Sequence, residues 1–273
     1  HGEIRRKDAR DIEPDNNPDL HLIPQLIAPD ADKKEHKKSL FIEKGYREAD
    51  INLGCPFPML ARRHNGCGML PYPEEVKALL SEAIDRHPDI RFSVKLRLGW
   101  EQAEECLDLL PLFNELPLAH IILHPRLGKQ QYKGEVDLEG FEAFYKECAH
   151  PLFYNGDLHT AEDIRSITTR FPRLAGIVIG RGLLANPALA LEYKQGTPVS
   201  SDEMAKKVGQ LHTEVFNSYR ELLQGGDTQL LTKMKSFWEY LLPDGDRKAR
   251  KTIHKTTKLA NYEAAVSNLL GMH

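Results

Sequence analysis

The sequence contains few cysteines and has no long apolar run. None of its four cysteines forms a Cys-x-x-Cys pair, which argues against a zinc ribbon, and four in 273 residues argue against a disulfide framework. Mean hydropathy is −0.48, and no apolar run approaches the roughly 20 residues of a membrane-spanning helix. The first residues also lack a signal-peptide core. We therefore expect a cytoplasmic protein without membrane attachment or bound metal.

The chain has no overall excess of positive charge. Its 37 basic side chains face 40 acidic ones, for a net charge of −3, so the whole chain is not a polycationic nucleic-acid binder. The charge is nevertheless divided unevenly, because residues 201–273 carry net +2 and the remainder −5. The C-terminal part is therefore mildly basic, which fits either an anionic partner or a solvated helical surface.

Short apolar runs alternate with amphipathic helical patterns over the first 200 residues. Because these runs read as strands that are apolar on both faces, the alternation favours a parallel sheet. One helix is predicted to start at Pro73 and another near Thr160. The six predicted strands are 22–27, 49–53, 91–96, 119–123, 151–154 and 176–179.

Polar residues gather where these predicted strands end. In a β/α barrel all strand ends converge on one face, whereas an open doubly wound sheet gathers them only at its switch point. Five separate clusters therefore favour a TIM-type β/α barrel. After the break at 196–201 the strand signals stop, and Ser200, Gly225-Gly226 and 243–246 read as helix boundaries. We predict a barrel domain over 1–199 and a small all-α domain over 200–273.

Two of the clusters fit a phosphate site. They are Asn155-Gly156-Asp157 and Gly180-Arg181-Gly182. Glycine lets backbone approach a ligand closely, and Arg181 adds a fixed positive charge. Taken singly, each cluster is better explained by turn glycines and a solvated arginine, but the pair together favours phosphate.

Lys95, His124 and Cys55 carry the remaining chemistry. A cation at Lys95 would stabilise a reduced, anionic flavin; a Schiff-base lysine and a salt-bridged lysine are the alternatives. Cys55 lies in a Gly-Cys-Pro turn directly after a strand, where a thiol can deliver a proton or act as a nucleophile. Cys67 is its rival, while Cys106 and Cys148 fall in helical patterns and read as packing residues.

These clusters together resemble the tRNA-dihydrouridine synthases, FMN-dependent β/α-barrel enzymes with a helical domain after the barrel. The likeness runs from about residue 22 to the C-terminus. The Asn-x-Gly-Cys-Pro turn at 52–56, followed by His-x-Arg at 124–126 and Gln-x-Tyr-x-Gly at 130–134, is its most specific part. The other matching stretches are Pro24-Gln25-Leu26, 94–99, 155–158 and 180–182.

The resemblance implies a reaction and a set of roles. Cys55 would protonate C5 of a tRNA uridine while hydride passes from reduced FMN to C6, with NAD(P)H as the reductant. Asn52 and Arg97 would meet the substrate, and Lys248, Arg250 and Lys251 would bind tRNA phosphates. The expected FMN-binding residues are Gln25, Lys95, His124, Arg126, Asn155, Gly156, Asp157, Gly180 and Arg181.

The front of the chain departs from the family pattern. A closed barrel has eight strands, only six are predicted, and residues 1–20 are charged and proline-rich. We expect a β/α portion to be missing at the N-terminus. Two alternatives remain: another FMN-dependent barrel oxidoreductase acting on a small molecule, and a non-catalytic RNA-binding barrel without cofactor. No protein partner is implied.

Overall fold

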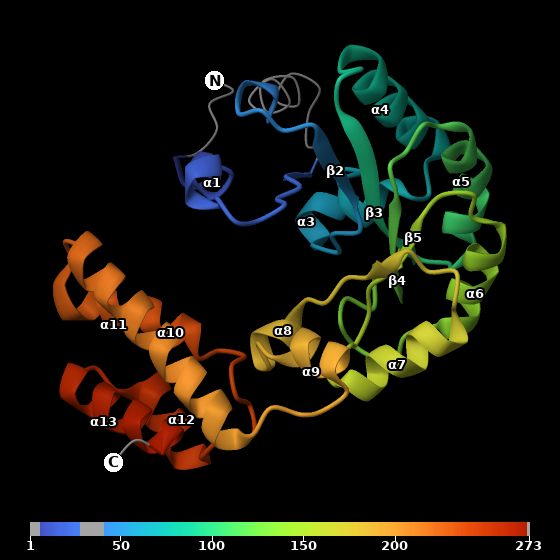
Figure 1. The fold of residues 1–273 in the computed structure, drawn as a ribbon. Helices are drawn as coiled ribbons and strands as arrows, with labels where there is room; N and C mark the ends of the chain where they lie inside the picture. The colour runs from blue at the N-terminus through green and yellow to red at the C-terminus, as the bar shows by residue number, and fades with distance from the viewer. Residues whose placement is uncertain (1–5, 28–40, 272–273) are drawn as a thin grey trace. The chain divides into compact units, whose positions relative to one another are not determined.

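The computed structural model describes residues 6–27 and 41–271 (Figure 1). Its sheet contains six parallel strands that pair in the order in which they occur along the chain. The strands are β1 (Gln25–Leu26), β2 (Glu48–Leu53), β3 (Arg91–Gly99), β4 (Ile121–Leu127), β5 (Leu152–Tyr154) and β6 (Gly176–Ile177).

The strand order confirms the predicted architecture. A doubly wound sheet reverses its order at a switch point, whereas strands of a β/α barrel follow one another around the sheet. All six strands lie where the sequence predicts them, and their sequential parallel pairing is that of a TIM-type β/α arrangement. No strand precedes β1 within residues 6–24.

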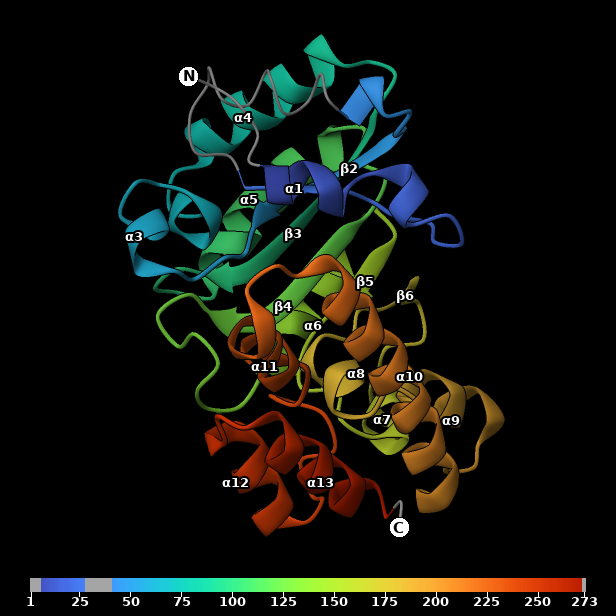
Figure 2. The same ribbon diagram turned by 90° about the vertical axis from the view of Figure 1, so that its left-hand side faces the viewer.

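The two faces of the sheet differ in polarity. On β3, Val94, Leu96 and Leu98 are buried on one face, while Ser93, Lys95 and Arg97 alternate with them on the other. The expectation that the strands are apolar on both faces is therefore wrong for β3, one face of which carries polar side chains along its length. Figure 2 shows β2 to β5 side by side.

Helices line the apolar face. They are α4 (Pro73–Arg86), α5 (Glu104–Glu115) and α6 (Leu138–Glu147), neighbours along one side of the sheet in Figure 1. Pro73 starts α4, as predicted, and Val76, Leu79, Leu80 and Ala83 form its buried side. Because these helices cover the apolar face, the polar face remains available for a functional site.

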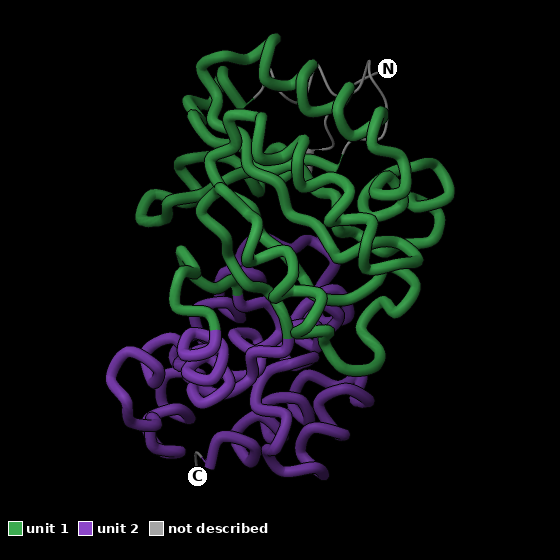
Figure 3. Tube along the Cα trace, turned by 90° about the vertical axis from the view of Figure 1, so that its right-hand side faces the viewer, with its two compact units in different colours: residues 1–156, 171–178 green, residues 157–170, 179–273 purple. Residues whose placement is uncertain are grey.

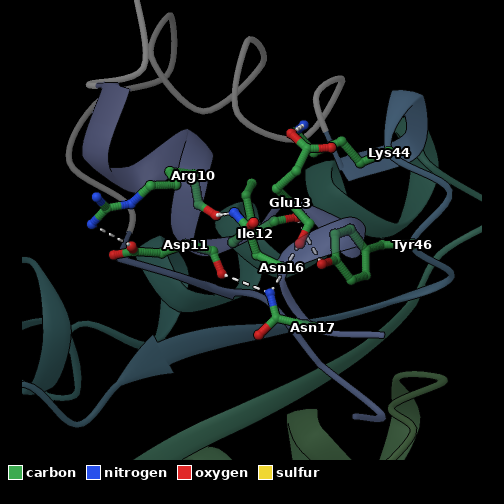
Figure 4. A network of polar contacts seen from close by, with 8 residues as sticks. All are labelled: Arg10, Asp11, Ile12, Glu13, Asn16, Asn17, Lys44 and Tyr46. Carbon is green, nitrogen blue, oxygen red and sulfur yellow. Dashed lines mark hydrogen bonds and ion pairs between the residues drawn. The ribbon is translucent and has the colours of Figure 1, made fainter. Parts of the chain in front are cut away.

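The N-terminal segment is attached to the start of β2 by polar contacts (Figure 4). It contains α1 (Arg6–Asp11) and the 3₁₀ turn η1 (Pro14–Asn16). The Tyr46 hydroxyl donates to the Ile12 carbonyl at 2.8 Å, and Lys44 forms an ion pair with Glu13. The Asn17 side chain donates to the Glu13 carbonyl at 3.0 Å. This charged segment is therefore folded, without adding a strand.

The chain divides into two compact units (Figure 3). The first comprises residues 1–156 and 171–178, the second 157–170 and 179–273. A functional boundary at 199/200 stays a prediction. The helices of the second unit are α7 (Ala161–Arg170), α8 (Arg181–Ala185), α9 (Leu189–Gln195), α10 (Ser201–Leu222), α11 (Gly226–Phe237), α12 (Arg247–Lys255) and α13 (Leu259–Leu270).

Local capping sets several of these boundaries. Ser200 Oγ accepts from the Glu203 amide at 3.2 Å and starts α10, as the sequence predicts. Thr160 and Asp163 cap α7 reciprocally, since Asp163 Oδ2 accepts from the Thr160 amide at 2.8 Å and Thr160 Oγ1 accepts from the Asp163 amide. Gly226 starts α11 rather than ending α10, which stops at Leu222.

The core of helices α10 to α13 contains three polar side chains that hydrogen-bond to one another. The Trp238 indole donates to the Tyr262 hydroxyl at 2.8 Å, and that hydroxyl lies 2.8 Å from His212 Nε2. All three side chains are buried. Burial lowers the pKa of His212 to about 4, so the ring is neutral and Nε2 accepts from the hydroxyl. None of the described helices has the length and apolarity needed to span a membrane.

Candidate active site

The polar face of β1 to β3 forms a continuous hydrogen-bonded row. Gln25, Asp50 and Ser93 are register partners on adjacent strands. Asp50 Oδ2 accepts from Gln25 Nε2 at 2.6 Å, and Oδ1 accepts from Ser93 Oγ at 2.8 Å. Burial raises the pKa of Asp50. Neither Asp50 nor Ser93 was singled out from the sequence. The signal for them is the alternation of polar residues within β2 and β3.

Asn52 holds the turn that carries Cys55. Its Oδ1 accepts from the amides of Gly54 at 3.0 Å and Cys55 at 2.8 Å, and its Nδ2 donates to Gln25 Oε1 at 2.7 Å. A Cβ on Gly66 would lie 2.6 Å from the Cys55 carbonyl, so only glycine fits where the next loop crosses this turn. The Cys55 side chain is half-buried and its backbone is fixed.

The other thiols are poorly suited to chemistry. Cys67 is fully buried in the 3₁₀ turn η2 (Gly66–Met69), where Sγ donates to the Cys55 carbonyl at 3.1 Å. Burial raises the pKa of Cys67 and of Cys106 to about 12, and also raises the pKa of Cys148. Among the four cysteines, the geometry therefore favours Cys55 as the reactive thiol. Cys67 instead helps to hold the Cys55 turn through its hydrogen bond to the Cys55 carbonyl.

Lys95 is a half-buried cation next to Asn52. The two are register partners on β3 and β2 and share the polar face. Burial, with a contribution from the Arg97 charge, lowers the pKa of Lys95. Within the described residues its ammonium has no ion pair or hydrogen bond. A desolvated cation is costly unless an anion or an acceptor faces it, so the site suits an electron-rich ligand.

Two buried arginines fix the loop at 127–134. Arg97 donates to the carbonyls of Gly54 at 3.0 Å, Leu127 at 3.0 Å and Gln131 at 2.6 Å. Arg126 donates to the Gly134 carbonyl at 2.6 Å and lies 3.3 Å from His124 Nε2. A role for Arg97 in substrate binding stays a prediction. Its contacts here are to backbone of the site.

The loop between these anchors presents an aromatic ring. Tyr132 is 56 % exposed, the Arg97 guanidinium lies 5.3 Å from its centroid, and the His124 ring lies 6.4 Å from it. His124 is buried on β4. The two arginines therefore hold an exposed aromatic side chain beside the polar face.

The residues predicted to bind phosphate fall in both compact units. In the first unit, Asn155 Nδ2 donates to the Val178 carbonyl at 2.8 Å, between the ends of β5 and β6. In the second, Arg181 and Asp157 form an ion pair at 3.6 Å. A phosphate site built from these residues with Gly156 and Gly180 stays a prediction.

Of the two glycines beside Arg181, Gly182 has no room for a side chain, whereas Gly180 has. A Cβ on Gly182 would lie 1.9 Å from the Leu158 carbonyl oxygen, while one on Gly180 would meet nothing within 4 Å. Close packing inside the second unit therefore explains Gly182 without a ligand.

The predicted tRNA-binding residues of α12 behave differently from one another. Lys248 and Lys251 are exposed. Arg250 instead donates to three backbone carbonyls. They belong to Leu241, to Leu242 (2.8 Å) and to Trp238 (3.3 Å). In residues 6–27 and 41–271, no three His, Cys, Asp or Glu side chains lie close enough to hold a metal ion.

The family of the chain follows from a match over nearly its whole length. The model of the family described as dihydrouridine synthase matches residues 3–270. The chain belongs to the dihydrouridine synthase family. The turn at Cys55 and the anchored loop at 127–134 are therefore features of a dihydrouridine synthase family member.

Known members are similar to this chain over only part of its length. It is 27 % identical over 166 residues to tRNA-dihydrouridine synthase B of Pasteurella multocida, covering 60 % of this chain and 49 % of that protein. It is 31 % identical over 170 residues to the tRNA-dihydrouridine(16) synthase of Pseudomonas syringae pv. tomato, covering 61 % and 52 %. The chain thus spans about half the length of the curated relatives it matches.

A solved structure also resembles the fold. The old yellow enzyme from Trypanosoma cruzi aligns with a TM-score of 0.44 and 13 % identity, over 63 % of this chain and 52 % of that one.

Proposed function

We propose that this dihydrouridine synthase family member reduces a uridine in tRNA to 5,6-dihydrouridine, with Cys55 as the general acid. The observation that carries the proposal is the geometry of Cys55. Asn52 Oδ1 binds the Cys55 amide at 2.8 Å, and Asn52 shares the polar face with the half-buried Lys95. The tRNA-dihydrouridine synthases among its relatives support the substrate class.

The chemistry requires a hydride and a proton on adjacent carbons. Uracil is electron-poor at C6, so hydride adds there, and C5 takes a proton from Cys55 Sγ. The resulting thiolate regains its proton from solvent. Bound reduced FMN would supply the hydride, with NAD(P)H as the source of its electrons.

The donor set of the site fits an FMN ring. Gln25, Lys95, His124 and Arg126 carry amide, ammonium, imidazole and guanidinium groups that can face flavin oxygens and nitrogens. Lys95 would stabilise the anionic reduced ring, whose charge would in turn offset its desolvation. Within the first unit, we assign the phosphate to Asn155 and Gly156.

Binding of tRNA would bring the base to this face. A uridine must leave its stack before an enzyme can act on its ring. Lys248 and Lys251 would hold tRNA phosphates from α12. Arg250, which is bound to three backbone carbonyls, would organise that helix.

The test uses Cys55→Ala, with Cys148→Ala as the matched control. We expect dihydrouridine formation on tRNA from a deficient strain to fall by about 10²- to 10⁴-fold in Cys55→Ala, because the proton donor is lost. The flavin absorption band of the purified protein should persist, and Cys148→Ala should retain the normal rate. A normal rate in Cys55→Ala would remove its assigned role. A colourless protein that still binds tRNA would favour the cofactor-free RNA-binding alternative.

A further inference from the structure

Asp50 occupies the centre of the row behind Cys55. It is 4 % exposed, lies between Gln25 and Ser93 in the register of the sheet, and accepts a hydrogen bond from each. Its side chain touches neither Cys55 nor the Asn52 amide through a hydrogen bond in the described chain, so any influence on the thiol must pass through another residue.

The hydrogen bonds from Asp50 to Cys55 have a fixed direction. A carboxylate only accepts, so the Gln25 amide must turn its nitrogen towards Asp50 and its oxygen away. That oxygen then accepts from Asn52 Nδ2, which turns the Asn52 oxygen towards the Cys55 amide. If either amide were flipped, two donors or two acceptors would face each other.

We infer that Asp50 is a positioning residue for Cys55: by accepting from Gln25, it fixes the orientation of the Gln25 and Asn52 amides and thereby holds the turn that carries the thiol. This rests on the proposed function for its significance in the reaction. The hydrogen-bond relay itself makes a claim that can be measured without turnover.

Gln25→Glu should disrupt the relay, because the new carboxylate faces the Asp50 carboxylate and two acceptors then meet. The turn then loosens, and we expect Cys55 to be alkylated by iodoacetamide roughly tenfold faster, the factor that corresponds to one lost hydrogen bond. Peptide mass spectrometry distinguishes Cys55 from the other three cysteines.

A second substitution should restore the relay. In the double variant D50N/Q25E the amide at position 50 donates to the carboxylate at position 25, which still accepts from Asn52, and Ser93 still donates to position 50. The alkylation rate should return to within about twofold of the original rate, which a packing defect caused by Gln25→Glu would not allow. Asp50→Asn alone should change the rate less than twofold, because its oxygen can accept from Gln25 while its nitrogen donates to the Ser93 hydroxyl. Asp50→Leu, which offers no acceptor to Gln25, should show the same gain as Q25E if Q25E folds poorly.

Ser93→Ala is the matched control, because it removes a hydrogen bond to Asp50 outside the relay. It should change the alkylation rate less than twofold. An unchanged rate in Q25E, or a double variant as reactive as Q25E, would overturn the inference. Rescue of alkylation without any dihydrouridine formation by the original protein would overturn the proposed function alone.

Discussion

Arg97 in the sheet and Arg250 in the helical tail form similar contacts with different consequences. Each guanidinium donates to three backbone carbonyls. The Arg97 contacts join the Cys55 turn to the loop that presents Tyr132, whereas the Arg250 contacts join the start of α12 to the segment after α11. The same bonding thus organises a reactive site in one region and a helix bearing exposed lysines in the other.

The two regions also differ in the surroundings of their buried titratable groups. Asp50 and Lys95 have pKa values shifted by burial, and they lie on a polar face with a half-buried thiol. His212 and Tyr262 also have pKa values shifted by burial, but they bind each other within an apolar core. A shifted pKa alone therefore does not mark a reactive site. A group with a shifted pKa marks a reactive site only if it can still bind a ligand as well as its protein neighbours.

The largest effect should come from the two arginines. Arg97→Met leaves three site carbonyls without their donor, so we expect the free energy of unfolding to fall by about 3 kcal/mol and alkylation of Cys55 to accelerate. Arg250→Met should cost about 2 kcal/mol, since Arg250 is only half-buried, and should leave Cys55 alkylation unchanged. Urea unfolding followed by circular dichroism measures the first quantity. Equal acceleration at Cys55 in both variants would remove the contrast between the regions.

A smaller effect should appear in the tail on acidification. Burial favours neutral His212, whose folded pKa of about 4 lies below its ordinary 6.5. The stability that this neutral ring provides is present above pH 6.5 and is lost as the pH falls from 6.5 towards 4. Between pH 7 and pH 5 the loss should be about 2 kcal/mol.

The two tryptophans allow this pH effect to be localised. Trp100 lies in the first unit and Trp238 in the tail, so Trp238 fluorescence in a Trp100→Phe background reports the tail alone. His212→Gln should flatten the pH dependence, because the glutamine oxygen can accept from Tyr262 without titrating. A tail equally stable at pH 5 and pH 7 would contradict the assignment of a neutral His212.

The smallest effect should come from the exposed lysines of α12. The double variant K248A/K251A should weaken tRNA binding about tenfold and lower the slope of log K against log salt by about 2, at nearly unchanged stability. The control is Lys206→Ala, at an exposed lysine of α10, and it should change neither value. Unchanged affinity in the double variant would favour a small-molecule oxidoreductase.

The sequence predicts the strands better than it predicts the site. Apolar runs located all six strands, but the fourth was predicted over 119–123, whereas β4 continues across the buried Pro125 to Leu127. A buried proline is tolerated there, and its carbonyl accepts from the Asp137 amide. Local patterns signal burial, while tertiary pairing sets where a strand stops.

The relay behind Cys55 could not be predicted because it depends on register. Gln25, Asp50 and Ser93 meet only because three strands align at those positions, which no local pattern specifies. The partners of Arg97 and Arg250 are backbone carbonyls, so residue types carry no signal for them. The sequence therefore does not reveal that Arg250, unlike the exposed Lys248 and Lys251, donates to backbone carbonyls.

The strand order bears on how the sheet forms. Each strand pairs with the one that follows it in the chain, so every pairing closes a loop of only a few dozen residues. The entropy of closing such loops is modest, and none of the strands within residues 6–27 and 41–271 has to wait for a distant segment before it can pair. As the chain emerges from the ribosome, each new strand finds the edge it needs already made, so the sheet can grow in step with synthesis.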